Sequence, residues 1–164
     1  MSHCSETGTV LKLAPPDAHR EKTMLKTRTM LATFALGATV AFAGPAFADK
    51  MKATLSGASE VPANTSAGKG AADIDYDAAT KKMTWKLTYS GLSGPATAAH
   101  FHGPAEADKN AGVALAIPNA TSSPVEGSAT LTDAQASDLL AGKYYINIHT
   151  AANAGGEIRG QVTK

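Results

Sequence analysis

Residues 82–89 read KMTWKLTY, and this stretch decides the fold class. Met83, Trp85 and Leu87 are apolar, and the positions between them carry Thr and Lys. Successive side chains of a β-strand point to opposite faces, so this alternation predicts a strand with one apolar and one polar face. Such strands are typical of antiparallel sheets that cover a core on one face and meet water on the other. We therefore expect an all-β antiparallel fold.

Similar short runs recur along the chain, separated by turn-forming residues. Residues 132–140 (TDAQASDLL) differ, because Thr132 fits a helix N-cap, Gln135 lies three residues later and Gly142 is placed as a C-cap glycine. The pattern predicts one short helix and about seven or eight strands, arranged as a sandwich or barrel. The alternative is an open antiparallel sheet with the helix packed on it. The other predicted strands are residues 52–58, 70–76, 97–102, 113–117, 125–131, 143–150 and 157–163.

The N-terminal part of the chain has the pattern of an export signal. Residues 30–44 (MLATFALGATVAFAG) are apolar and uncharged, basic residues precede them, and the small-x-small sequence AFA follows at 46–48. The run is shorter than the roughly 20 residues of a membrane span, although an uncleaved anchor is the alternative. We predict a disordered upstream extension at 1–23, a signal peptide at 24–48 and a working domain at 49–164. The domain would then be periplasmic or secreted, with no membrane span after signal cleavage.

The charge and cysteine content of the predicted domain exclude some classes of function. Residues 49–164 hold ten Lys and Arg and eleven Asp and Glu, a net charge of −1. A nucleic-acid-binding domain usually carries a basic patch, so we expect no nucleic acid as partner. The only cysteine, Cys4, lies upstream of the domain, so no disulfide supports the fold. At this length one hydrophobic core is sufficient.

Three histidines stand out in two of the predicted strands. His100 and His102 flank Phe101, so both imidazoles leave one face of a strand and the phenyl ring leaves the other. In residues 144–150 (YYINIHT), His149 lies on the face opposite to the two isoleucines. If Phe101 and the isoleucines face the core, all three imidazoles lie outside it. We predict that they converge on one point of the outer face.

A set of short motifs runs along the predicted domain: LSGA at 55–58, EVP at 60–62, AHFHGPA at 99–105, LT at 131–132, LLAGKYYINIHT at 139–150 and GGEIRGQ at 155–161. Together these motifs resemble the CHRD domain family, which is named after chordin and also occurs as single exported domains in bacteria. The resemblance covers essentially all of residues 51–162 and implies a compact all-β domain of immunoglobulin-like or barrel type, with an uncharacterised biochemical role. One small departure is Ala154, where many relatives have proline.

Three neutral imidazoles suit zinc or copper and leave a position for water, an anion or a substrate. The residue types therefore favour a copper or zinc site at His100, His102 and His149, with copper ahead in an exported protein. The pattern also resembles, more distantly, the copper site of Cu/Zn superoxide dismutase, which is a β-sandwich too. The chain lacks the disulfide cysteines and the further histidines of that enzyme. Asn147, Glu157 and Arg159 are candidates for contacts to the histidines or to an anion.

Three interpretations of the histidine face stay open at this stage. The first is a metal site, and the second is a hydrogen-bonded scaffold in a non-enzymatic module that binds a protein or an envelope component. The third is a superoxide dismutase-like copper enzyme with Arg159 as its anion guide. In the scaffold interpretation Glu157 and Arg159 form an exposed charge pair or a structural network around His149. The sequence favours a binding domain over an enzyme.

Overall fold

A computed structural model describes residues 48–164 of the chain. The predicted upstream extension and nearly all of the predicted signal peptide lie outside the described residues. Within 48–164, no helix is long and apolar enough to cross a membrane. The strands are β1 (Asp49–Ser56), β2 (Lys69–Asp77), β3 (Lys82–Ser90), β4 (Ala96–His102), β5 (Val113–Ile117), β6 (Val125–Thr130), β7 (Tyr145–Thr150) and β8 (Ile158–Gln161), and the helices are the 3-10 turn η1 (Gly57–Ser59) and α1 (Asp133–Leu140).

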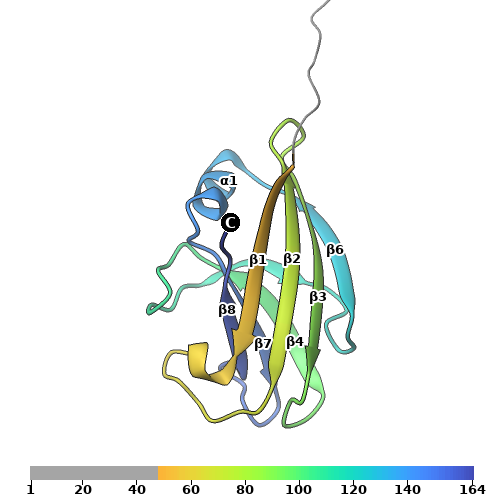
Figure 1. Cartoon of the computed structure of the whole chain (residues 1–164), viewed down its shortest axis with the longest axis vertical. Coiled ribbons are helices and arrows are strands. Elements are labelled where there is room, and N and C mark those ends of the chain that lie inside the picture. The colour runs from red at the N-terminus through yellow and green to blue at the C-terminus, as the bar shows by residue number, and fades with distance from the viewer. Residues whose placement is uncertain (1–47) are drawn as a thin grey trace, which may run out of the picture. The chain divides into compact units, whose positions relative to one another are not determined.

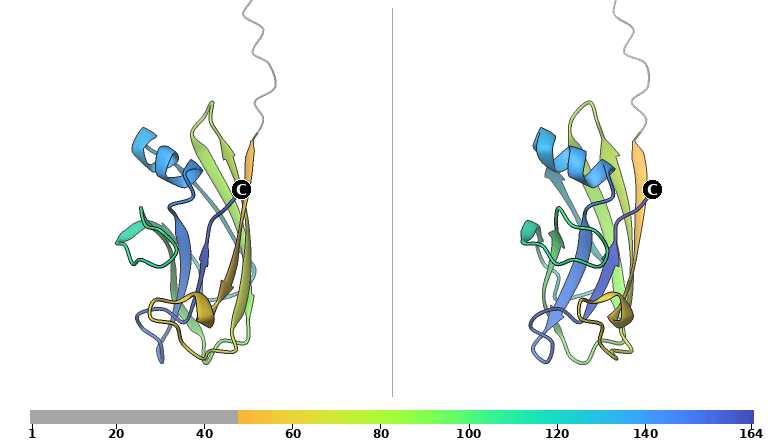
Figure 2. Two further views of the ribbon diagram at one scale, coloured as in Figure 1. Left: turned by 60° about the vertical axis from the view of Figure 1, so that its left-hand side comes forward. Right: turned by 90° about the vertical axis from the view of Figure 1, so that its left-hand side faces the viewer.

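The eight strands form one antiparallel sheet in the order β5-β4-β7-β8-β1-β2-β3-β6. Figures 1 and 2 show this sheet folded over, so that β1, β2, β3 and β6 face β8, β7, β4 and β5 in a nearly closed barrel. The sheet bends over at its centre, at the short pairing of β8 with β1, where Ser56 lies opposite Arg159. The predicted antiparallel all-β class is confirmed.

The core fills the space between the two halves of the folded sheet. The rings of Trp85 on β3 and Phe101 on β4 meet edge to face across it, with centroids 5.3 Å apart and an interplanar angle of 69°. Gly127 lies opposite Trp85 on β6, and a Cβ there would overlap the indole ring. The alternating apolar residues of the sequence therefore face inward, as predicted. The other fully buried core residues include Leu55, Met83, Leu87, Ile146, Ile148, Ile158 and Val162.

The helix α1 forms where the sequence predicted it. The Thr132 side chain accepts a hydrogen bond from the Gln135 backbone N–H, and the Gln135 side chain accepts one from the Thr132 backbone N–H, which completes the capping box. Gly142 ends the helix with a φ of +72°, a conformation that glycine adopts without steric cost.

Three predicted strands have a boundary that is wrong by more than one residue. β1 begins at Asp49 and ends at Ser56, because residues 57–59 turn into η1. β7 begins only at Tyr145, and β8 is confined to Ile158–Gln161, so neither Lys143 nor Glu157 belongs to a strand. On β5, Val113 is 57% exposed although it alternates with Leu115 and the buried Ile117. A register shift between Phe101 and His102 of β4 breaks the alternation there.

Candidate metal centre

The three histidines lie together on the outer face of β4 and β7. His100 and His102 extend from β4, and His149 extends from the neighbouring β7, where it pairs with Ala98. Their ring centroids are 5.1 Å apart for His100 and His149, 5.6 Å for His100 and His102, and 6.1 Å for His102 and His149. One nitrogen from each ring lies within 4.8 Å of the other two. The predicted convergence of the three imidazoles is confirmed.

Backbone carbonyls fix the orientation of two of the rings. His102 Nδ1 lies 3.0 Å from the Ala111 oxygen, and His149 Nδ1 lies 3.0 Å from the Ala154 oxygen. Because a carbonyl only accepts hydrogen bonds, each Nδ1 carries the proton and each Nε2 presents a lone pair. The His102 Nε2 is buried and has no hydrogen-bond partner. Hydrogen bonds of this kind orient metal-binding histidines in proteins.

The third ring, His100, faces the lone pair of His149. Its Nδ1 lies 3.2 Å from His149 Nε2. Two imidazole nitrogens on one tetrahedral zinc ion lie about 3.3 Å apart, given bonds of about 2.0–2.1 Å. This pair is therefore already spaced for a shared ion, provided His100 moves its proton to Nε2. All three ligand nitrogens lie within 4.8 Å of one another, close to the roughly 4 Å that two such bonds can span.

Burial lowers the pKa of two histidines of the cluster. Burial lowers the pKa of His100, and the charges of His149 and His102 lower it further. Burial also lowers the pKa of His102, and this effect outweighs the hydrogen bond to Ala111. A histidine must be neutral to bind a metal, so both shifts extend the pH range in which the site has free lone pairs.

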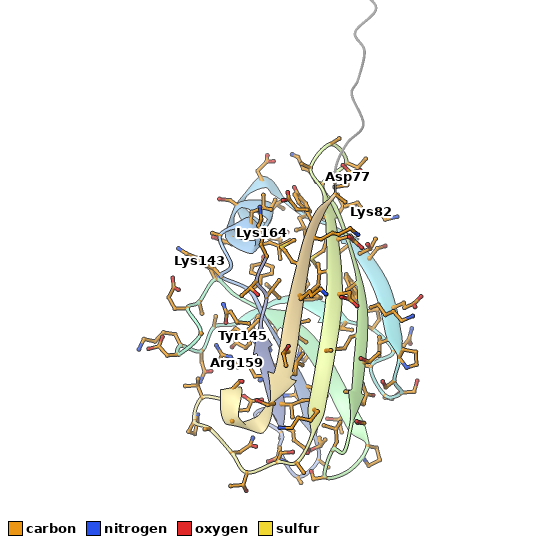
Figure 3. All side chains as sticks on the ribbon, in the orientation of Figure 1. Asp77, Lys82, Lys143, Tyr145, Arg159 and Lys164 are labelled. Atoms are coloured by element: carbon orange, nitrogen blue, oxygen red, sulfur yellow. The ribbon has the colours of Figure 1, made fainter. Side chains whose placement is uncertain are left out.

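A stack of side chains supports His102 from behind. Its ring lies against Tyr145 with centroids 5.0 Å apart and planes 7° from parallel. The Arg159 guanidinium carbon lies 3.5 Å from the centroid of the same tyrosine ring. Figure 3 shows Tyr145 and Arg159 close together beside β8, on the side of η1. The Tyr145 hydroxyl also donates to the Ala111 oxygen at 3.3 Å, so one carbonyl serves both aromatic rings.

A family model described as the CHRD domain matches residues 51–162, which include every strand except the first residues of β1. The chain belongs to the CHRD domain family. No curated protein and no solved structure shows a match to it. In this CHRD domain the matched region contains the three histidines and the stack behind them.

In this CHRD domain Arg159 is buried against the loop 103–112. The side chain is 1% exposed, and its guanidinium donates to the Asn110 side chain at 2.9 Å and to the Lys109 oxygen at 2.7 Å. These bonds hold the loop 103–112, whose Ala111 carbonyl orients His102. The predicted exposed charge pair of Glu157 and Arg159 is wrong, because both side chains are buried and no ion pair joins them within the described residues.

Glu157 lies in a separate polar cluster at one end of the barrel. Its carboxylate accepts hydrogen bonds from Ser66 Oγ at 2.7 Å, Ser93 Oγ at 2.6 Å and Thr150 Oγ1 at 2.6 Å. The Ser93 backbone N–H donates as well, at 2.7 Å. Because Glu157 precedes β8, strand alternation does not govern its direction. No hydrogen bond among these residues joins Glu157 to His149.

Asn147 contacts a residue that the sequence analysis did not single out. Its Nδ2 donates to both carboxylate oxygens of Glu60, at 3.2 and 3.1 Å, and its Oδ1 is buried without a partner. Burial raises the pKa of Glu60 to about 6, although Arg159 and Asn147 both favour the charged form. The signals for Glu60 and Tyr145 were weak: Glu60 lies in the EVP motif, and Tyr145 shares its face with His149.

Proposed function

We propose that this CHRD domain is an exported metal-binding domain that holds copper or zinc through His100, His102 and His149. One observation carries the proposal: three imidazoles from two strands present ligand nitrogens within 4.8 Å of one another. The carbonyls of Ala111 and Ala154 support it further, because they leave the Nε2 atoms of His102 and His149 free to bind. The signal-like residues 24–48 support export.

The donor set favours copper(II) or zinc(II) among biological metals. Imidazole is a good ligand for both, whereas thiolate and thioether ligands select copper(I). The nearest methionines in the fold, Met51 and Met83, are buried in the core and face away from the cluster. Between the two metals, copper is our first choice because all three donors are nitrogens and the protein has an export signal pattern.

The proposal is tested by following thermal unfolding of the full chain with added copper or zinc. A ligand that binds only the native state stabilises it by about 2.7 kcal/mol when its free concentration is about 100 times Kd. We expect a clear rise in Tm for the wild type and none for H102A or H149A. His3, Cys4 and His19 remain in both H102A and H149A, so a loss of the rise in Tm in these variants is due to the cluster. The control variant H19A should keep the full rise.

An equal rise in Tm for H102A, H149A and the wild type would overturn the proposal, because the metal would then bind elsewhere. The absence of a rise with either metal would favour the scaffold interpretation. In that case the histidines only connect β4, β7 and their loops through the hydrogen bonds to Ala111 and Ala154.

A further inference from the structure

The positive charge of Arg159 is buried among neutral partners. The guanidinium donates to the oxygens of Lys109 and Glu106 and to the Asn110 side chain, and it stacks on Tyr145. Within residues 48–164, no carboxylate oxygen lies within 4.0 Å of it. Buried charges in proteins are normally paired with an opposite charge. The outer face of β7 and β8 therefore holds a positive charge that is not neutralised by direct contact.

This charge acts on the histidine cluster. Only the Tyr145 ring separates the guanidinium from the His102 ring. A positive charge this close favours a negative charge beside His102 Nε2, which is buried without a hydrogen-bond partner.

The cluster itself supplies no negative charge. Its three donors are neutral imidazoles, and no Asp, Glu or Cys of the described part of the chain belongs to the group. A divalent ion held there keeps its full charge, and three protein ligands leave a coordination position open. We propose that, when a metal is bound, this open position takes a small inorganic anion, drawn by the metal and by the buried charge of Arg159. The inference rests on the proposed function.

A substitution of Glu60 would change the electrostatic potential at the cluster while leaving the three histidines unchanged. Its carboxylate and Arg159 line the same pocket of about 390 Å³, and Glu60 partly compensates the guanidinium without contacting it. Asp108 lines this pocket too, but it is exposed and paired with Lys109. Replacing Glu60 by Gln keeps the size of the side chain and removes one negative charge. It should therefore strengthen anion binding.

The test uses the full chain loaded with copper(II) and titrated with azide at pH 7.5. Azide that replaces water on copper(II) produces a charge-transfer absorption band, and the copper EPR spectrum changes with it. We expect a band that saturates with azide concentration for the wild type. For E60Q the band should saturate at an azide concentration about fivefold lower, as expected for the removal of one partly screened charge. The matched control is E126Q, which makes the same charge change on β6, where Glu126 pairs with Lys86. It should leave the azide affinity unchanged.

Two results would overturn the inference while leaving the proposed function intact. One is that copper binds the wild type but not H102A, and azide still produces no charge-transfer band in the copper-loaded wild type. The other is an equal change in E60Q and E126Q, which would mean that only the net charge of the chain matters. A failure of copper to bind the cluster at all would reject the proposed function and this inference together.

Discussion

Glu157 and Glu60 are both buried carboxylates, but their surroundings differ. Glu157 is fully buried at one end of the barrel and accepts four hydrogen bonds, from Ser66, from the backbone and side chain of Ser93, and from Thr150. Glu60 is 8% exposed, beside the outer face of β7, and receives side-chain hydrogen bonds from Asn147. The two sites thus differ in the number of hydrogen-bond donors that replace the water lost when the carboxylate is buried.

The pKa values of the two carboxyls follow from this difference. Burial raises the pKa of Glu157, but the hydrogen bonds from Ser93, Thr150 and Ser66 outweigh it and bring the pKa to about 2. For Glu60, burial outweighs the attraction of Arg159 and the bonds from Asn147, and the pKa rises to about 6. The Glu157 cluster stabilises the fold in its charged form, whereas the charge of Glu60 costs stability at neutral pH.

The buried polar atoms without partners show the same contrast. Of the four buried side-chain atoms without partners in residues 48–164, His102 Nε2, Asn147 Oδ1 and Gln161 Oε1 lie on β4, β7 and β8. The fourth, Trp85 Nε1, lies in the core on β3. Unsatisfied groups of this kind reduce stability unless a ligand or water pairs with them. The comparison indicates that the polar groups at the end of the barrel are compensated more completely than those of the histidine face.

The largest effect is expected from E157Q, which should destabilise the fold by about 3 kcal/mol at pH 7, measured by urea unfolding. A folded pKa of about 2, against the ordinary value of 4.5, means that the charged form is favoured in the native state. This stability is fully present above pH 4.5 and is lost as the pH falls to about 2. The difference between E157Q and the wild type should therefore shrink below pH 4.5. Equal stability at pH 7 would show that the hydrogen-bonded cluster contributes little.

The opposite sign is expected from E60Q, which should stabilise the metal-free chain by about 1–2 kcal/mol at pH 7.5. A folded pKa raised to about 6 means that the uncharged form is favoured, and Gln resembles that form. The stability from protonated Glu60 is present below pH 4.5 and is lost as the pH rises through 6. Urea unfolding at pH 7.5 and pH 4.5 should thus give a gain only at the higher pH. A loss of stability at pH 7.5 would contradict the contrast between the two glutamates.

The smallest effect is expected from S66A, which removes one of the donors to Glu157. The hydroxyl donates at 2.7 Å, and its loss should cost about 1 kcal/mol at pH 7, because three other donors to the carboxylate remain. The matched control is S59A, because Ser59 is exposed and its hydroxyl contacts only the Ser56 side chain. Urea unfolding should separate the two variants. A cost as small as that of S59A would mean that Ser93 and Thr150 suffice to hold the carboxylate.

Local patterns explain why much of the fold was predictable. The alternation in residues 82–89 reports which side chains face the core, and the structure buries Met83, Trp85 and Leu87 accordingly. The capping box of Thr132 and Gln135 involves neighbours in sequence, so the helix could be located from the sequence. The histidine cluster followed from the same alternation, applied to β4 and β7.

The supporting residues of the site could not be predicted, because their partners come from distant loops. Alternation placed Glu157 and Arg159 on one face, but Glu157 precedes β8 and turns into the barrel end instead. Arg159 does follow the strand, and it is buried because the loop 103–112 covers it. Glu60 reaches Asn147 over 87 positions in sequence, and no local pattern reports such a contact.

The sequence by itself determined the strand-rich fold, the capped helix and the face on which His100, His102 and His149 lie, because each depends on the spacing of neighbouring side chains. Only the tertiary structure decided which nitrogens of the imidazoles are free, which carboxylate is compensated and where the charge of Arg159 is buried. These properties depend on hydrogen bonds and burial contributed by loops that meet only when the sheet folds over.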